Sequence, residues 1–363
     1  LRIGDDENGF TLDGVLLELR MLTDQPGIRV DVFADMTMRV GPLFLEVNTF
    51  GGWGGWWAES PEAHPAALDG GVHAPQGVAV EFTTEPLQGG GFLQLQENGA
   101  YAGAFAFRVS KFSLAGLAVF EDVGGAPSIL VQANMALPAP IPLTMGFELV
   151  RIGGVLGINR SIDLEAVRSS VSTGAIGALF TGDVIARARE NLPTLQAFFP
   201  AKRGSHVFGG ILQLSWLPLG SGHLLRADMA IAIELPSMAR IAIFGSVRIE
   251  IPDLPRLLQL RVDFAGGIDF TAMMLAFDAS LVNSQILDLF QVTGDIALRL
   301  AWGGRPGFLL TAGGFHPSYK PEVPGIPTLQ RLALTLNRSL GSLQIRAEAY
   351  FAVTSNTVQA GGK

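Results

Sequence analysis

The sequence predicts a mainly β fold: a long antiparallel, strongly curled sheet with a small helical insertion near residues 160–200. Three observations predict it. Apolar and polar residues alternate with period two along many segments, which is typical of strands with one buried face. The turns between these segments are too short for parallel crossovers, so neighbouring strands should be antiparallel. Only the region near residues 159–199 has helical spacing instead.

The clearest alternation lies between Leu224 and Val353, where we expect about eight consecutive strands. In the first of them, an aliphatic set alternates with a small or charged set: Ala227, Met229, Ile231, Ile233 and Leu235 against Arg226, Asp228, Ala230, Ala232 and Glu234. We expect the aliphatic set of each strand to face the core and the other set to face water. Four prolines between Pro317 and Pro327 predict a long irregular loop.

The N-terminal half has the same character but is less regular. Residues 28–40 and 43–50 predict a hairpin, and further strand candidates continue to Ile152. The glycine- and tryptophan-rich segment 51–57 predicts the start of a loop that runs to about Pro75.

We expect three parts: an N-terminal antiparallel β half (1–160), a helical insertion (161–200) and a C-terminal antiparallel β half (201–363). The two β halves are expected to form one continuous sheet. Because a sheet of many long strands twists strongly, it should curl into a barrel-like or groove-like form or split into a sandwich.

Within the insertion, residues 163–171 predict a helix that starts with acidic residues, and residues 183–191 predict a second helix. Pro193 would open a third short turn of helix. Asn159 and Arg160 precede the first helix and could bind an anion near its N-terminus. The alternative is that Ser161, with Asp163 or Glu165, caps the helix.

Composition narrows the function classes. The formal net charge is −8 and no basic run is present, which disfavours a nucleic-acid partner. The absence of cysteine excludes thiolate metal sites and a cysteine nucleophile. No run of about 18 apolar residues occurs, so we expect no transmembrane helix. The chain starts at Leu1 without Met, which suggests a fragment of a larger protein; nothing indicates its compartment.

No recognisable catalytic motif is present. No serine lies in a Gly-x-Ser-x-Gly frame, and no histidines have the spacing of a helical zinc site. The glycine-rich turn at 153–157 lacks the frame of a phosphate-binding loop. We therefore expect no metal and no cofactor, and we lean towards a protein that is not an enzyme.

Eight residues remain as ligand-binding candidates: Trp53, Trp56, Trp57, Asn159, Arg160, Trp302, His316 and Tyr319. The three clustered tryptophans could stack on a sugar or enter a membrane interface, or could fold over one end of the sheet. Asp295 and Arg299 share one face of the strand before Trp302, where an exposed ion pair is the simplest interpretation. His316 and Tyr319 lie in an unusual loop that has no obvious carboxylate partner.

Three segments resemble one known family: 145–160, then 293–299 with 313–317, and 347–359. The family is a domain of unknown function found in large, mostly bacterial, β-rich proteins. The resemblance covers most of the chain from about Gly89 onward. It implies no reaction, cofactor or catalytic residue.

Three functions fit these observations. The first is a non-enzymatic module that binds or transfers an apolar molecule such as a lipid in a hydrophobic groove or cavity. The second is a structural or assembly module of a large envelope or secreted complex, whose partners would be other protein subunits. The third is a hydrolase with an unrecognised site, for which His316, Tyr319 and Asp295 would be the first residues to replace.

Overall fold

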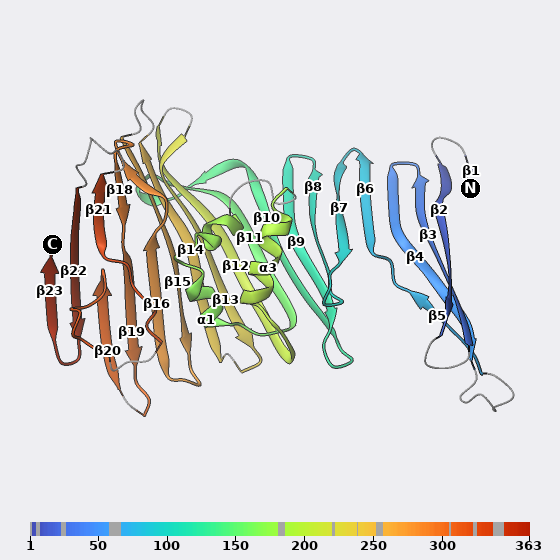
Figure 1. The fold of residues 1–363 in the computed structure, drawn as a ribbon. Coiled ribbons are helices and arrows are strands. Elements are labelled where there is room, and N and C mark those ends of the chain that lie inside the picture. The colour runs from blue at the N-terminus through green and yellow to red at the C-terminus, as the bar shows by residue number, and fades with distance from the viewer. Residues whose placement is uncertain are drawn as a thin grey trace. The chain divides into compact units, whose positions relative to one another are not determined.

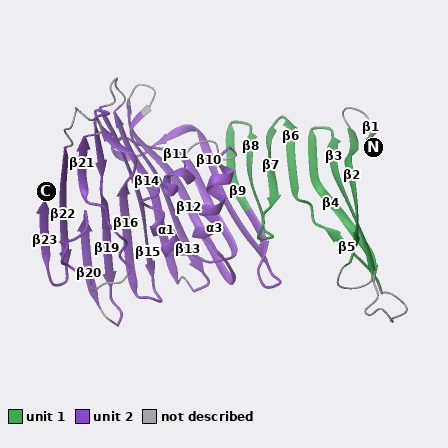
Figure 2. Ribbon diagram, in the orientation of Figure 1, with its two compact units in different colours: residues 1–118 green, residues 119–363 purple. Residues whose placement is uncertain are grey.

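The computed structural model consists of antiparallel strands with three short helices (Figure 1). It describes residues 2–4, 8–22, 27–57, 67–180, 186–219, 222–237, 239–251, 257–304, 306–321, 325–336 and 345–363. The chain divides into two compact units, unit 1 (Leu1–Ala118) and unit 2 (Val119–Lys363) (Figure 2). Strand β9 (Phe112–Asp122) contains the boundary. The predicted fold class, a mainly β chain with a helical insertion near 160–200, is confirmed.

Unit 1 is an antiparallel sheet of long strands joined mostly by short turns. Its strands are β1 (Arg2–Gly4), β2 (Asn8–Met21), β3 (Gly27–Val40), β4 (Leu43–Trp57), β5 (Ala67–His73), β6 (Gly77–Thr84), β7 (Leu87–Leu95) and β8 (Tyr101–Val109). Strand β4 pairs with β3 along one side and with both β5 and β6 along the other. The predicted hairpin of residues 28–40 and 43–50 is confirmed.

The predicted loop at residues 51–57 is wrong, because strand β4 continues through Trp57. Glycines permit this extension: a Cβ on Gly51 would overlap the carbonyl oxygen of Val32 on the paired strand, so only glycine fits there. The glycines therefore mark close strand contact rather than a turn.

Unit 2 begins with three very long strands: β10 (Pro127–Pro142), β11 (Phe147–Arg160) and, after the helices, β12 (Ala201–Leu219). The chain continues through β13 (Gly222–Leu235), β14 (Arg240–Ile251), β15 (Leu258–Asp269), β16 (Met274–Leu281), β17 (Ser284–Ile286), β18 (Phe290–Thr293), β19 (Asp295–Ala301), β20 (Gly307–Ala312), β21 (Leu332–Leu336), β22 (Arg346–Thr354) and β23 (Val358–Gly362). Strands β10 to β16 pair in chain order, and β16 then pairs with β19. This sheet is strongly curled (Figure 1).

The helical insertion comprises α1 (Leu164–Ser169), α2 (Ala175–Phe180) and α3 (Ala188–Phe198), which lie against one face of the unit 2 sheet (Figure 1). The first predicted helix is confirmed, but its N-cap is Asp163 and not Ser161. The Asp163 side chain accepts hydrogen bonds from two backbone N–H groups. The predicted helix at 183–191 lies partly outside the described residues, and α3 continues past Pro193.

The side of the sheet that is buried is the reverse of the predicted one. On β13 the small and acidic set is buried, whereas Ile231 is 47% exposed. On β19 Ala297 and Arg299 are fully buried, whereas Leu300 is 43% exposed. The alternation itself is confirmed; only the assignment of its two faces was wrong.

The helices explain this inversion. Small residues on the sheet, such as Ala242 and Ala265, leave room for the large apolar side chains of the insertion. Phe180, Phe198 and Phe199 surround Phe244 of β14, with ring centroids 5.4–6.3 Å apart. We call this side the helix-covered face and the opposite side the aliphatic face.

Candidate functional site

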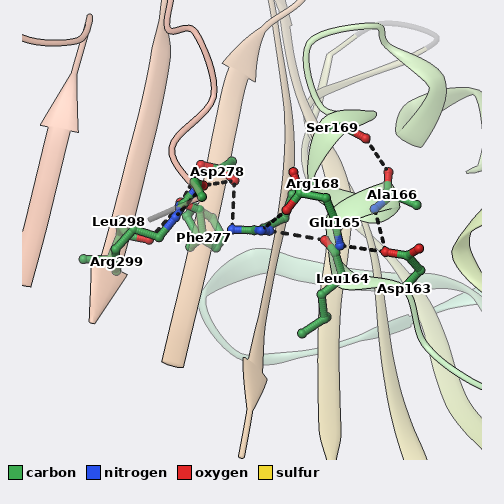
Figure 3. A network of polar contacts seen from close by, with 11 residues as sticks. Asp163, Leu164, Glu165, Ala166, Arg168, Ser169, Phe277, Asp278, Leu298 and Arg299 are labelled. Carbon is green, nitrogen blue, oxygen red and sulfur yellow. Dashed lines mark hydrogen bonds and ion pairs between the residues drawn. The ribbon is translucent and has the colours of Figure 1, made fainter. Parts of the chain in front are cut away.

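The helix-covered face of unit 2 carries a buried network of charged side chains (Figure 3). Arg299 of β19 is 0% exposed and binds Asp278 of β16 in a bidentate pair, with N–O distances of 2.8 and 3.0 Å. Its guanidinium also donates to the carbonyl oxygens of Gly325, Phe277 and Leu298. The prediction of an exposed pair between Asp295 and Arg299 was therefore wrong.

Asp278 joins the sheet to helix α1. Arg168 is in the last turn of α1. Its Nη1 lies 3.9 Å from Asp278 Oδ2, and its guanidinium also bonds to Glu165 on the same helix (Figure 3). Burial raises the pKa of Asp278, and the Arg299 guanidinium opposes that rise. The network thus fixes the register of α1 on the sheet.

Beside this network, a cleft of about 330 Å³ opens between α1 and strands β14 to β16. Arg240 crosses it, with Nε 3.1 Å from Asp269 Oδ2 and Nη1 3.6 Å from Glu234 Oε2. Arg240 also donates to the carbonyl of Ile162, whose N–H donates to Glu234. Because each of these charged groups already has a partner within the protein, we assign the ion pairs of this cleft a structural role.

A second polar feature crosses the strands. Cross-strand register places five buried residues in one transverse row, Asp228, Ser246, Asp263, Ser280 and Asp295, on β13, β14, β15, β16 and β19. Most of their side chains have partners, such as Ser280 Oγ, which donates to Asp295 Oδ1 at 2.6 Å.

Two members of the row are less well satisfied. Burial raises the pKa of Asp228, although Gln213 donates to this carboxyl and Arg248 lies 3.5 Å away. Asp228 Oδ2 and Ser246 Oγ are buried without a hydrogen-bond partner among the described residues. Groups of this kind are uncommon in native folds and point to a ligand or bound water.

The aliphatic face has the opposite character. From β12 to β20, the strand residues paired on this side include no Asp, Glu, Lys or Arg. Its members remain partly open to solvent, for example Phe208 (48%), Ile231 (47%) and Ile243 (40%). Exposed apolar patches on monomeric proteins rarely exceed a few hundred square ångströms. This face is therefore a candidate binding surface.

Two aromatic rings lie over glycines in the middle of the aliphatic face. A Cβ on Gly245 would meet the Phe264 ring, and one on Gly266 would meet the Phe277 ring, so each ring lies over a glycine of the neighbouring strand. The two rings stack with centroids 5.9 Å apart. Gly210, farther along, has nothing within 4 Å of its Cβ position and leaves the backbone open.

The predicted tryptophan cluster lies in unit 1 and is not a single patch. Trp53 lies beneath the guanidinium of Arg29, with Cζ 4.3 Å from the ring centroid, and against Gly71 of β5. Trp56 has the opposite strand parity and is 49% exposed. Trp57 ends β4, and its side chain lies outside the described residues.

Asn159 and Arg160 serve internal contacts at the end of β11. The Asn159 amide donates to the carbonyl of Pro127 at 2.8 Å and accepts from the N–H of Gly204 at 2.9 Å. Arg160 is 1% exposed, donates to the carbonyl of Phe199 and forms an ion pair with Glu121. These contacts tie the strand to the helical insertion.

The remaining candidates are on the surface of unit 2. Trp302 follows β19 and is 46% exposed. His316 accepts a hydrogen bond from the N–H of Ser318 through Nδ1, and Tyr319 packs on Phe315 with ring centroids 5.3 Å apart. Among the described residues, no contact joins Asp295 to His316 or Tyr319, so the proposed hydrolase trio is not assembled by any described interaction.

The sequence reasoning missed Asp228, Arg248 and Asp278 because charged residues of the strands were assigned to the water-facing side, and it assigned Arg168 only to the predicted helix. A usable signal was present on two strands: Asp228 shares its face of β13 with Ala230 and Ala232, and Asp278 shares its face of β16 with Ala276, and helices can cover such small residues. In the described part of the chain, no group of three His, Cys, Asp or Glu side chains is arranged to hold a metal ion. No described helix has the length and apolar character that spanning a membrane requires.

Comparison with known proteins gives one match, to the model of a family of unknown function, DUF6603, over residues 5–363. The chain belongs to the DUF6603 family. The predicted resemblance is confirmed, and the match extends it from Gly89 back to residue 5, through unit 1. No curated protein and no solved structure matches this DUF6603 chain.

Proposed function

We propose that unit 2 of this DUF6603 protein binds an apolar molecule, such as a lipid acyl chain, on its aliphatic face and catalyses no reaction. The observation that supports the proposal is that the described strand positions paired on this face between β12 and β20 include no charged residue, together with the exposure of the face. Exposed apolar area costs about 25 cal/mol per Å² relative to burial, so an occupant would stabilise the protein.

The continuity of the face fits an extended ligand. Cross-strand pairs place aliphatic side chains next to one another: Ile231 with Ile243, Phe277 with Leu298, and Leu298 with Leu310. An acyl chain needs a surface of this kind and makes no hydrogen bonds. A protein partner usually adds about one hydrogen bond per 100–200 Å² of interface, and the strand positions of this face offer few polar side chains for that purpose.

The proposal can be tested with the full chain. Lipid extracted from protein purified without detergent should be detected by mass spectrometry, and delipidated protein should bind a fluorescent fatty acid. Ile243→Glu should weaken that binding at least about tenfold, because a charge in an apolar contact costs more than 1.4 kcal/mol. The matched control is Phe270→Glu, an exposed aromatic residue in the turn after β15, which should bind as the wild type does.

The same experiment distinguishes the assembly alternative. If no lipid copurifies, no fatty acid binds, and light scattering shows a dimer or larger oligomer that Ile243→Glu dissociates, then the face is a contact between copies of the chain and the lipid proposal is wrong. Equal fatty-acid binding by the two variants would also overturn it.

A further inference from the structure

A cluster of arginines lies at one end of the helix-covered face, away from the aliphatic face. Register places Arg226 of β13 directly opposite Arg248 of β14, and Arg248 directly opposite Arg261 of β15. Like charges directly opposite on neighbouring strands destabilise a sheet. A fourth strand adds to the cluster, since Arg151 of β11 pairs in register with Gln213, which is opposite Asp228.

The carboxylates nearby leave two of these arginines without a hydrogen bond. Asp263 is bound on both oxygens by Arg261, at 2.7 and 2.8 Å, and its charge also acts on Arg248. Asp228 faces Arg151, Arg226 and Arg248, while Glu148 is in register with Ser215 and Glu250 follows Arg248 by two residues. Neither Arg151 nor Arg226 forms a hydrogen bond or a close ion pair within the described residues.

Unpartnered hydroxyl groups point to the same place. Ser215 of β12 is in register with Arg226, and Ser246 precedes Arg248 by two residues on the same face. Both serines are 0% exposed, and neither Oγ has a hydrogen-bond partner among the described residues. Nη2 of Arg248 is buried and lacks a hydrogen bond as well. Buried hydroxyl groups and a guanidinium nitrogen without acceptors are groups that an oxyanion would satisfy; Asp228 Oδ2, opposite Ser246, is a buried acceptor without a donor at the same place.

We propose that Arg151, Arg226 and Arg248, with the hydroxyls of Ser215 and Ser246, form a binding site for a phosphate-class oxyanion. Guanidinium groups suit this ligand because their planar N–H donors match two oxygens of one phosphate. Arg226 is exposed, so the site is accessible from solution. The site lies on the other side of the sheet from the aliphatic face and does not depend on the proposed function.

Titration calorimetry on the full chain tests the site, with inorganic phosphate as the probe in a buffer free of other oxyanions. We expect saturable binding that Arg226→Gln weakens at least about tenfold, the effect of losing one charge-assisted hydrogen bond pair. Since Arg226 is exposed, this variant should fold normally, which circular dichroism checks. The control is Arg346→Gln, which removes an exposed arginine of β22 that pairs with Glu348.

Vesicles of phosphatidic acid in neutral lipid form the second arm and distinguish a lipid headgroup from a free phosphate ester. Binding to either probe that falls in Arg226→Gln and persists in Arg346→Gln supports the site. No binding to either probe up to about 10 mM phosphate, far weaker than typical specific sites, would overturn it. Equal loss in both arginine variants would overturn it too, because non-specific charge would then explain the binding.

Discussion

Replacing Asp278 with asparagine should destabilise unit 2 by about 3 kcal/mol. Arg299 is fully buried and donates two charge-assisted hydrogen bonds to this carboxylate. Removing one partner of a buried pair costs about 3–5 kcal/mol, because the remaining charge is left uncompensated. The lower figure applies here, since Arg299 keeps its bonds to three backbone carbonyls, including that of Gly325.

The assay is urea denaturation followed by circular dichroism. Glu348→Gln is the matched control: it breaks the exposed pair with Arg346, 2.6 Å long, and should cost at most about 1 kcal/mol. A double variant, Asp278→Leu with Arg299→Met, should recover most of the loss because two well-packed apolar side chains can replace a buried ion pair.

Two results would refute this reasoning. One is an Asp278→Asn variant as stable as the Glu348→Gln control. The other is a double variant that is no more stable than Asp278→Asn, which would mean that the remaining charge on Arg299 is not what destabilises the single variant.

Three further predictions concern other parts of the chain. Burial raises the folded-state pKa of Asp228 above its unfolded value, so the contribution of Asp228 to stability falls as pH rises from about 4 towards the folded pKa. The free energy of unfolding of Asp228→Asn, relative to the wild type, should therefore increase over that range. A difference that stays constant with pH would contradict this prediction. Ile243→Glu should leave the thermal midpoint nearly unchanged, since its site is 40% exposed, and a large drop would show that the face is packed. In unit 1, Gly103→Ala should lower the free energy of unfolding by more than about 1 kcal/mol, because the new Cβ would overlap the carbonyl oxygen of Phe92. In the control Gly54→Ala the new Cβ has open space, so the free energy of unfolding should change by about 0.5 kcal/mol or less. Equal effects of the two variants in denaturant melts would refute the clash.

Much of the fold could be predicted because strand formation is a local property. Alternation along residues 226–235 and the proline that follows predict strand β13 and its end at Leu235, although the strand begins earlier, at Gly222. Asp163 and Glu165, on either side of Leu164, likewise mark the start of α1. Segment 51–57 was misread because glycine permits both a turn and a close strand contact, and only the position of Val32 on the paired strand decides between them.

The candidate sites were much less predictable. Asn159, Arg160 and His316 were chosen for their chemistry, but the structure shows Asn159 and Arg160 engaged in internal hydrogen bonds. The arginine cluster could not be predicted because its members are on four separate strands and meet only through the register of those strands. Asp278 and Arg299 are 21 residues apart, so their pairing depends on how β16 and β19 align.

By itself, the sequence determined that this chain forms antiparallel strands with two chemically distinct faces, since period-two alternation fixes which side chains share a face. It could not determine which face is covered. Which face is covered depends on where the insertion of residues 164–198 packs. The helices pack on the side where alanine and glycine leave room for Phe180, Phe198 and Phe199. Tertiary packing therefore buried the charged side chains in pairs and left the aliphatic ones exposed.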